Sequence, residues 1–505
     1  MARPRRFSLT VSLISLVEFL SLTSGSTLQQ PCADGGGGPA AGVRAGYWSP
    51  SSSRYSPVSS IDASLFTHLY YSSVSIDEAS YAVAPPPADE APLLAAFSST
   101  VKSGSPSAKT MLSIGTDEYR VDVSNAAFSR MASDRSLRGV FINSSVELAR
   151  ANGFDGLDLS WIFPATQMDM VNLGVLLAEW RAKITEESAT NSLSEPLLLT
   201  ATLYFSNHLF DMPDSNLDYP IDDISSNLDW ANILTFGFHG GSNVTTVDAP
   251  LYDATSHFSV SYGVISWLDA GVPPCKLVMG IPLFGRSWFL RNKAKNGIGS
   301  PAAAAGTKQR KSNQTGIIAY AEVEEYMDTG STVVTYDSQS VAEYFCNGDL
   351  WVSFDSAQVV QKKLEFAARS QLLGYFLWTV GFDDSNSTIS KQATESWHQY
   401  AQDGFGTMHA GGSNQEALIV PSRGEEAQAT VESSRLSGLI PRHDILCGGD
   451  ARRILAELKK KTCEVGVTLL LLAIETTTPE DPIVAGLMAV RRFLCYERPL
   501  AGCIL

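Results

Sequence analysis

The sequence predicts a (β/α)8 barrel, the TIM-barrel architecture of the α/β class, with a small α+β insertion between its seventh and eighth strands. Three observations lead to this fold class. Eight short apolar runs of β type lie between residues 43 and 400, amphipathic stretches of helical period separate them, and about 90 residues separate the last two runs. Eight such units are the count for a closed barrel. An open doubly wound sheet is the alternative, but no glycine-rich dinucleotide turn follows the first run.

Several of the eight runs lack the strict alternation of a half-exposed strand, which is typical of parallel strands that are covered on both faces. The predicted strands are 44–48, 66–72, 110–115, 156–163, 197–205, 231–238, 276–284 and 373–380, and the predicted helices include 136–152, 168–186, 256–270 and 357–370. The gap after the seventh strand holds β-like segments at 316–322, 332–336 and 350–354. Residues 287–354 are therefore interpreted as an insertion that deepens a cleft at the C-terminal rim of the barrel.

The charge balance limits the kind of partner. The chain has 505 residues, 44% of them hydrophobic, with 53 acidic against 37 basic residues and a formal net charge of −16. Nucleic acids and anionic membranes attract basic proteins, so we expect no nucleic acid and no membrane as partner. The sequence has no P-loop and no G-x-S-x-G elbow, and His68 and His239 lack partners at ligand spacing. We therefore expect no cofactor and no metal.

The two ends of the chain differ from the part between them. Residues 1–26 have a basic start, an apolar run and small residues at the end, which predicts a signal peptide, and residues 27–42 follow as a glycine-rich linker. Residues 401–505 show little periodicity and are interpreted as a poorly ordered tail, with a small module as the alternative. Four N-x-S/T sequons fit a secretory route, and the seven widely spaced cysteines do not suggest a disulfide framework. We expect an extracellular glycoprotein.

The fourth predicted strand contains the segment Gly-Phe-Asp-Gly-Leu-Asp-Leu-Ser-Trp-Ile-Phe-Pro at residues 153–164. Alternate side chains of a strand share a face, so Asp158, Ser160 and Ile162 point into the barrel mouth, whereas Trp161 points outward beneath the helices. The segment resembles the D-x-x-D-x-D-x-E signature of glycoside hydrolase family 18, the chitinases. The stretches 45–48, 66–69, 111–115, 228–232 and 374–378 likewise resemble strand motifs of plant class V chitinases.

The resemblance implies a chemistry that this chain lacks. In the family a Glu protonates the glycosidic oxygen, and a neighbouring Asp orients the 2-acetamido group that attacks the anomeric carbon. The four motif positions of strand 4 read Asp155, Asp158, Ser160 and Ile162 here, and the family's M-x-Y-D on strand 6 corresponds to 234–237. There the tyrosine is replaced by Phe236 and the carboxylate by Gly237. No catalytic set is intact, and loss of the general acid alone typically costs 10²–10⁴-fold in rate.

The resemblance also implies a sugar-binding cleft. Trp378 matches the tryptophan on which the family stacks a pyranose ring, and Tyr47, Phe236 and Asp158 are further sugar-binding candidates. Each has an alternative interpretation as a core or structural residue. The adjacent carboxyl groups at 383–384 follow the eighth strand, where they either accept hydrogen bonds from sugar hydroxyls or are merely solvated.

These patterns predict a secreted, monomeric chitinase-like protein that binds chitin or N-acetylglucosamine oligosaccharides and is catalytically inactive. One alternative is an active chitinase that hydrolyses β-1,4 links with a displaced carboxylate. Another is a protein-binding inhibitor, and a third is a decayed copy without a ligand.

Overall fold

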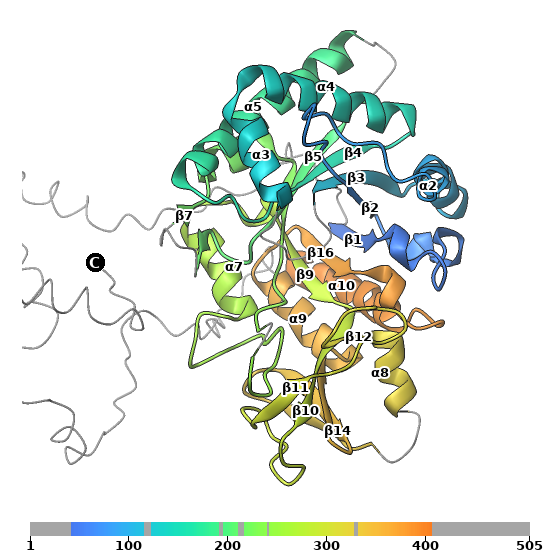
Figure 1. Cartoon of the computed structure of the whole chain (residues 1–505), viewed down its shortest axis with the longest axis vertical. Coiled ribbons are helices and arrows are strands. Elements are labelled where there is room, and N and C mark those ends of the chain that lie inside the picture. The colour runs from blue at the N-terminus through green and yellow to red at the C-terminus, as the bar shows by residue number, and fades with distance from the viewer. Residues whose placement is uncertain are drawn as a thin grey trace, which may run out of the picture. The chain divides into compact units, whose positions relative to one another are not determined.

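Eight strands of the described residues pair into one closed parallel barrel, which confirms the predicted fold class (Figure 1). In the computed structural model, residues 42–115, 123–190, 195–210, 217–239, 242–327 and 332–406 are described. The predicted signal peptide, nearly all of the predicted linker and nearly all of the predicted tail lie outside these residues. The barrel strands are β1 (Val43–Trp48), β2 (His68–Val74), β3 (Lys109–Gly115), β4 (Gly156–Ser160), β5 (Leu198–Leu203), β8 (Trp230–Ile233), β9 (Leu277–Pro282) and β16 (Gly374–Trp378).

The strands are buried on both faces because two separate cores cover them. Side chains such as Met111 point into the barrel interior, and their neighbours such as Leu112 pack outward against the helices. The register of the closing pair sets Tyr47 of β1 beside Trp378 of β16. On the other side, Tyr47 lies beside Tyr70 of β2. The same inward face therefore carries the aromatic and polar residues that the sequence places at the barrel mouth.

The helices begin at polar capping residues and cover the outside of the barrel. The Asp134 carboxylate accepts the Ser136 N–H (2.8 Å), and the hydroxyls of Ser259 and Ser356 accept N–H groups in the first turns of the helices that follow them.

None of the helices in the described ranges is long and apolar enough to cross a membrane. The helices are α2 (Ala91–Gly104), α3 (Val123–Ser133), α4 (Arg135–Ala151), α5 (Gln167–Thr190), α6 (Ile221–Asn227), α7 (Val260–Asp269), α8 (Tyr320–Met327), α9 (Ala357–Arg369) and α10 (Thr388–Gly406).

Short elements complete the connections between strands and helices. The 3-10 turns are Pro50–Ser52, Val58–Ser60, Ala63–Leu65, Pro274–Lys276 and Val380–Phe382, and the strands β6 (His208–Leu209) and β7 (Leu217–Asp218) form a small antiparallel pair after β5.

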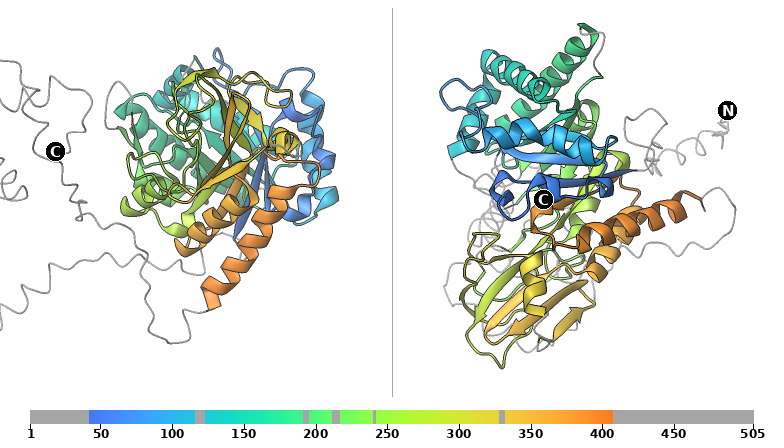
Figure 2. Two further views of the ribbon diagram at one scale, coloured as in Figure 1. Left: turned by 90° about the horizontal axis from the view of Figure 1, so that it is seen from below. Right: turned by 90° about the vertical axis from the view of Figure 1, so that its right-hand side faces the viewer.

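A second, antiparallel sheet lies between β9 and β16 in the chain (Figure 2). Its order is β11-β10-β15-β14-β13, with β12 paired to β10. We call the stretch from β10 to β15 the insertion; the right-hand view of Figure 2 shows it in yellow and light orange, next to the barrel strands. Its strands are β10 (Phe284–Leu290), β11 (Ala302–Ala305), β12 (Ile317–Ala319), β13 (Val334–Asp337), β14 (Ala342–Asn347) and β15 (Leu350–Phe354).

Five predicted barrel strands, the fourth to the eighth, are longer than the observed ones. The fourth ends at Ser160 because its neighbour β3 ends at the paired Gly115, and the sixth ends at Ile233, whose carbonyl accepts the Thr235 N–H in a turn (3.0 Å). The segment predicted as β-like at 316–322 divides into β12 and the start of α8. The Glu322 carboxylate accepts the Ala319 N–H (3.2 Å), which begins a helix where apolar composition alone predicts a strand.

Two ion pairs join the insertion to the barrel side of the molecule. Lys363 of α9 pairs with Asp355, which follows β15, and their side chains are 0% and 4% exposed. Burial lowers the pKa of Lys363 and raises that of Asp355. Arg286 of β10 contacts Asp248 of the loop after β8, with Nε 2.9 Å from Oδ1. Because each charge is withdrawn from water, each partner depends on the other for compensation.

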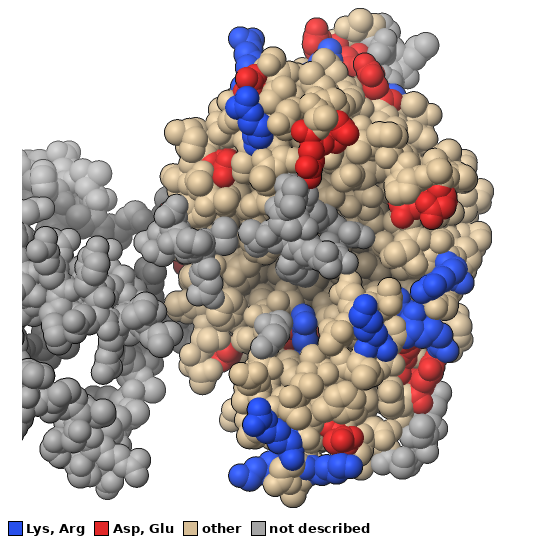
Figure 3. Space-filling model, viewed as in Figure 1, with Lys and Arg blue, Asp and Glu red and all other residues tan. Residues whose placement is uncertain are grey.

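The surface charge is unevenly distributed. Figure 3 shows Lys and Arg side chains gathered on the half of one face that the insertion forms, although the whole chain has a net charge of −16. Many of the acidic side chains visible on this face lie over α3, α4 and α5.

We expect Lys363→Met to lower the free energy of unfolding by about 3–5 kcal/mol, because it leaves the Asp355 carboxylate buried without its cation. Lys362→Met is the matched control: Lys362 is exposed and pairs with Glu365 at 3.1 Å, so its loss should cost less than about 1 kcal/mol. Urea denaturation of both variants measures the difference. Equal losses would contradict the structural role of the buried pair.

Candidate functional site

The carboxylate of Asp158, on β4, lies inside the barrel and is fully buried. Four hydroxyl groups donate to it: Ser113 (2.7 Å), Thr202 (3.0 Å) and Tyr47 (3.4 Å) to Oδ2, and Thr200 (2.7 Å) to Oδ1. Burial raises the pKa of Asp158, and the hydrogen bonds from these hydroxyls oppose part of that rise. The strand register brings the groups together, because Asp158 lies beside Ser113 of β3 and Thr200 of β5.

A second layer of polar groups surrounds this carboxylate. The Asn232 side-chain amide, on β8, donates to the hydroxyls of Tyr47 (2.7 Å) and Tyr70 (3.2 Å), and its oxygen accepts the Trp230 indole N–H (3.1 Å). The rings of Tyr47 and Tyr70 stack at a centroid distance of 4.3 Å. Burial raises the pKa of both tyrosines, so their hydroxyls stay neutral and act as hydrogen-bonding groups. The network thus connects strands on opposite sides of the barrel.

The positions where the family pattern implies three further acids and a tyrosine are apolar or small. Ile162 is 6% exposed and belongs to the interior cluster together with Phe236, Leu234 and Phe284. The Phe236 ring packs against Phe284 with centroids 5.9 Å apart. An isoleucine has no proton to transfer and a phenylalanine has no hydroxyl, so neither of these two side chains can act as a general acid.

Two small residues occupy the remaining motif positions. Ser160 ends β4 and is 4% exposed. Gly237 follows Phe236 with a φ of 78°, a conformation that residues with a Cβ atom rarely adopt. A carboxylate at either position is absent.

Trp378 differs from the other sugar-binding candidates because part of its surface is exposed. Tyr47 and Asp158 are 0% exposed and Phe236 is 1% exposed, whereas Trp378, the last residue of β16, is half-buried. Its ring lies 4.9 Å from that of Tyr47 and 6.3 Å from that of Phe236, centroid to centroid. Among the four candidates, Trp378 is therefore the side chain that a ligand can reach in this conformation.

The structure places Asp155 at the opposite end of the barrel from the mouth. Its carboxylate accepts the backbone N–H of Thr110 (2.8 Å) and lies 2.9 Å from the Lys102 ammonium and 3.7 Å from that of Lys109. These contacts tie the start of β3 to α2. Although Asp155 stands in the motif, its position is a structural one.

The remaining predicted groups are also accounted for by contacts within the fold. Asp383 accepts hydrogen bonds from the backbone N–H and hydroxyl of Ser390, and Asp384 accepts two from Thr388, so both carboxylates cap α10. Trp161 stacks on Phe128 outside the barrel, as the strand alternation predicts.

Of the two histidines considered in the sequence analysis, His68 is buried and His239 is half-buried. Burial lowers the pKa of His68 to about 4, and burial also lowers that of His239, which lies near the Arg286–Asp248 pair. Within the described residues no group of three His, Cys, Asp or Glu side chains is arranged to hold a metal ion.

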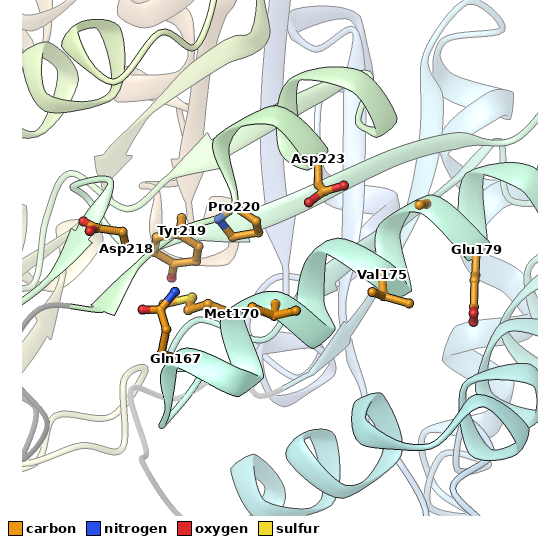
Figure 4. Close-up of a pocket in the computed structure, with 10 residues that line it drawn as sticks. Gln167, Met170, Val175, Glu179, Asp218, Tyr219, Pro220 and Asp223 are labelled. Carbon is orange, nitrogen blue, oxygen red and sulfur yellow. The ribbon is translucent and has the colours of Figure 1, made fainter.

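A cavity of about 510 Å³ lies on the outer side of the barrel, away from these residues (Figure 4). Met170 and Val175 of α5 form one wall, and Tyr219, Pro220 and Asp223 form the other. None of the residues predicted from the sequence lines it.

Sequence reasoning missed the hydroxyl and amide side chains that surround Asp158. They are Ser113, Thr200, Thr202 and Asn232. The period-two alternation of a strand could have indicated two of them, because it places Thr200 and Thr202 on the face of β5 that points into the barrel.

Comparison with known proteins gives consistent matches over the barrel. Residues 43–383 match a family model described as glycosyl hydrolases family 18. A Nod factor hydrolase from Medicago truncatula is 38% identical over 345 residues, which cover 68% of this chain and 86% of that protein. A class V chitinase from Nicotiana tobaccum, solved in complex with NAG4, is 35% identical with a TM-score of 0.65 over 70% of this chain and 99% of that one. A chitinase-like agglutinin from Robinia pseudoacacia is 32% identical with a TM-score of 0.61 over 70% of this chain and 99% of that one.

We expect Asp158→Asn to change how stability depends on pH. Because the folded-state pKa of Asp158 is raised above its ordinary value of 3.8, the stability it contributes is fully present below that value and is lost as the pH rises through the folded pKa. Relative to the wild type, the variant should therefore become more stable as the pH rises from about 4 through the folded-state pKa of Asp158.

Urea denaturation across this range measures the difference, with Asp134→Asn as a control of opposite sign. The Asp134 carboxylate caps α4, and the hydrogen bond from Ser136 lowers its pKa, so its removal should cost more stability as the pH rises. A wild-type minus Asp158→Asn difference that stays constant with pH would contradict the raised pKa.

Proposed function

Because the chain belongs to glycosyl hydrolase family 18, we propose that it is a chitinase-like protein that binds N-acetylglucosamine-type glycans at the barrel mouth without hydrolysing them. The observation that carries the proposal is Ile162, which lies in the interior apolar cluster at the position of the general acid. Phe236 and Gly237 extend the loss to the groups that would hold the acetamido oxygen of the substrate.

The contacts of the remaining carboxylates argue against a displaced acid. Asp158 is fully buried and accepts four hydroxyl donors, and Asp155 is at the far end of the barrel. At the rim, Asp248 pairs with Arg286, and the carboxylates at 383–384 cap α10. None of these carboxylates is both exposed and placed beside Trp378, where a proton donor to a bound sugar would have to lie.

Binding is supported by the aromatic surface that persists where the acids are lost. A half-exposed tryptophan offers its face to the apolar face of a pyranose ring, and the neighbouring Tyr47 and Phe236 rings hold it in place. Related proteins with this barrel include a class V chitinase solved with NAG4 and a chitinase-like agglutinin. By analogy with them, we propose that chitin oligosaccharides are the ligands of this chain.

We also propose that the protein is secreted and glycosylated. The asparagines of the four sequons, Asn143, Asn243, Asn313 and Asn386, are all exposed, and Cys275 takes part in a disulfide bond. Recovery of the protein from the medium of eukaryotic cells, with a mass that falls after enzymatic removal of N-glycans, would support this route; retention inside the cells would refute it.

Calorimetric titration with an N-acetylglucosamine tetrasaccharide tests the binding proposal. We expect binding by the wild type, a loss of about 5- to 50-fold in Trp378→Ala, and a smaller loss in Trp378→Phe, which keeps an aromatic face. Turnover of a chromogenic chitotrioside should stay at background in all three proteins. No heat of binding at millimolar oligosaccharide would overturn the proposal.

Restoring the lost groups tests whether the mouth still accepts substrate. We expect the triple variant Ser160→Asp, Ile162→Glu, Phe236→Tyr to hydrolyse the chitotrioside about 10²–10⁴-fold faster than the same triple with Ile162→Gln, because only the glutamic acid can donate a proton. The apolar surroundings of residue 162 should also raise the pKa of that acid and keep it protonated. Gly237 is left unchanged because of its φ of 78°. Equal rates in the two triples would show that substrate does not reach residue 162.

A further inference from the structure

The basic residues of the insertion are segregated along the chain. From Arg286 to Lys311 the sequence contains seven Lys and Arg residues and no Asp or Glu, in a protein with a net charge of −16. Arg286 is paired with Asp248, but the others lie in two surface loops and are exposed, except for the half-buried Lys311. We call the group that they form with Arg54 the basic rim: Arg54, Arg291, Lys293, Lys295, Lys308, Arg310 and Lys311.

The first of the two loops follows β10 and is hydrogen-bonded to the segment between β8 and α7. The backbone of Ser300 accepts the Thr245 N–H (2.9 Å), and Thr245 in turn accepts the Gly299 N–H (2.8 Å). The Ala302 N–H donates to Asn243 (2.8 Å). Because β10 begins at Phe284, which packs against Phe236, and ends at Leu290, the residues Arg291, Lys293 and Lys295 lie at the end of the insertion away from the barrel.

The second loop extends the positive charge toward the end of β1. Arg310 contacts Glu325 at 2.7 Å, and Tyr55 is near enough to raise the pKa of Arg310 slightly, after the larger effect of that carboxylate. Arg54 lies over the ring of the exposed Tyr55, 4.6 Å from its centroid. The basic rim therefore consists of two loops at opposite ends of the β10–β11 hairpin, together with Arg54 of the segment after β1.

Most of this charge is not neutralised by the protein itself. Within the described part of the chain, Arg310 is the member of the basic rim with a carboxylate within 4 Å. Figure 3 shows the blue side chains gathered on the insertion half of the face, with few red ones between them. Like charges held together on a surface repel one another, and an anionic ligand relieves that repulsion.

We propose that the basic rim binds the carboxylates of an acidic polysaccharide, a polyuronate, whose chain lies along the β10–β11 side of the insertion. Neutral hydrogen-bonding side chains stand between the cations, among them Asn292, Asn296 and Thr307, and the exposed Tyr55 adds an aromatic face. Such a mixture suits a sugar chain better than a surface of phosphates, because sugar rings offer both hydroxyls and apolar faces.

Charge density distinguishes a polyuronate from nucleic acid. Duplex DNA carries about one charge per 1.7 Å, and a protein of net charge −16 repels so dense a polyanion beyond a short range. A polyuronate has one carboxylate per sugar ring, so the local attraction of the basic rim meets less overall repulsion. The inference goes beyond the proposed function, since it concerns a different surface and a different class of glycan.

Binding of the full chain to oligogalacturonate, measured by calorimetry at low and high salt, tests the proposal. We expect binding that weakens with salt and that is lost with the methyl-esterified oligomer, which has the same rings without the charge. The variant Lys293→Gln, Lys295→Gln, Lys308→Gln should bind about 10–100-fold more weakly at low salt. The matched control Arg135→Gln, Lys362→Gln, Lys391→Gln removes three charges on α4, α9 and α10 and should bind as the wild type does.

Three outcomes would overturn the proposal: no binding of oligogalacturonate, an equal loss in both triple variants, or single-stranded DNA of equal charge bound as tightly as the uronate. Titration of the same variants with the neutral N-acetylglucosamine tetrasaccharide separates this proposal from the proposed function. The tetrasaccharide affinity should not change in either triple variant, and it depends on Trp378 instead. Failure of one titration therefore leaves the other interpretable.

Discussion

The carboxylate of Asp158, surrounded by four hydroxyl donors, is the interaction on which the barrel interior depends. A carboxyl group that is buried away from water needs hydrogen bonds to both of its oxygens. Here the donors are side chains of β1, β3 and β5. Asn232 of β8 then holds the tyrosine that completes the set. The polar interior of the barrel is therefore a single connected network, and the apolar residues toward the mouth close over it.

The side chains that stand at the family's catalytic positions contribute to the packing of the barrel interior. Adjacent carboxylates near the mouth would repel one another and lose hydration, which are costs that active enzymes accept for function. Ile162 and Phe236 instead add apolar contacts to the interior cluster. The barrel can keep its fold without the other acids of the motif. Asp158, which belongs to the motif by sequence, is hydrogen-bonded to strand residues inside the barrel and not to groups at the mouth.

Sequence patterns could predict the strands of the barrel because burial on both faces leaves a strong apolar signal in each one. They could not locate the ends of β4 and β8, which depend on where a neighbouring strand stops pairing, as Gly115 does beside Ser160. Nor could they separate Asp155 from Asp158. Asp155 lies just before β4 and Asp158 in the middle of it, along a strand that rises about 3.3 Å per residue, so their partners come from different segments.

The segregation of charge has a consequence for how the molecule moves near other charged bodies. With seven cations and no anion from Arg286 to Lys311, and an excess of anions in the rest of the chain, the protein carries an uneven charge distribution, an electric dipole, as well as a net charge. A fixed negative surface exerts a torque on such a dipole and turns the β10–β11 part of the insertion toward itself. In a negatively charged gel the protein would thus diffuse with a preferred orientation, and its translation and its rotation would be coupled within about one Debye length of the matrix.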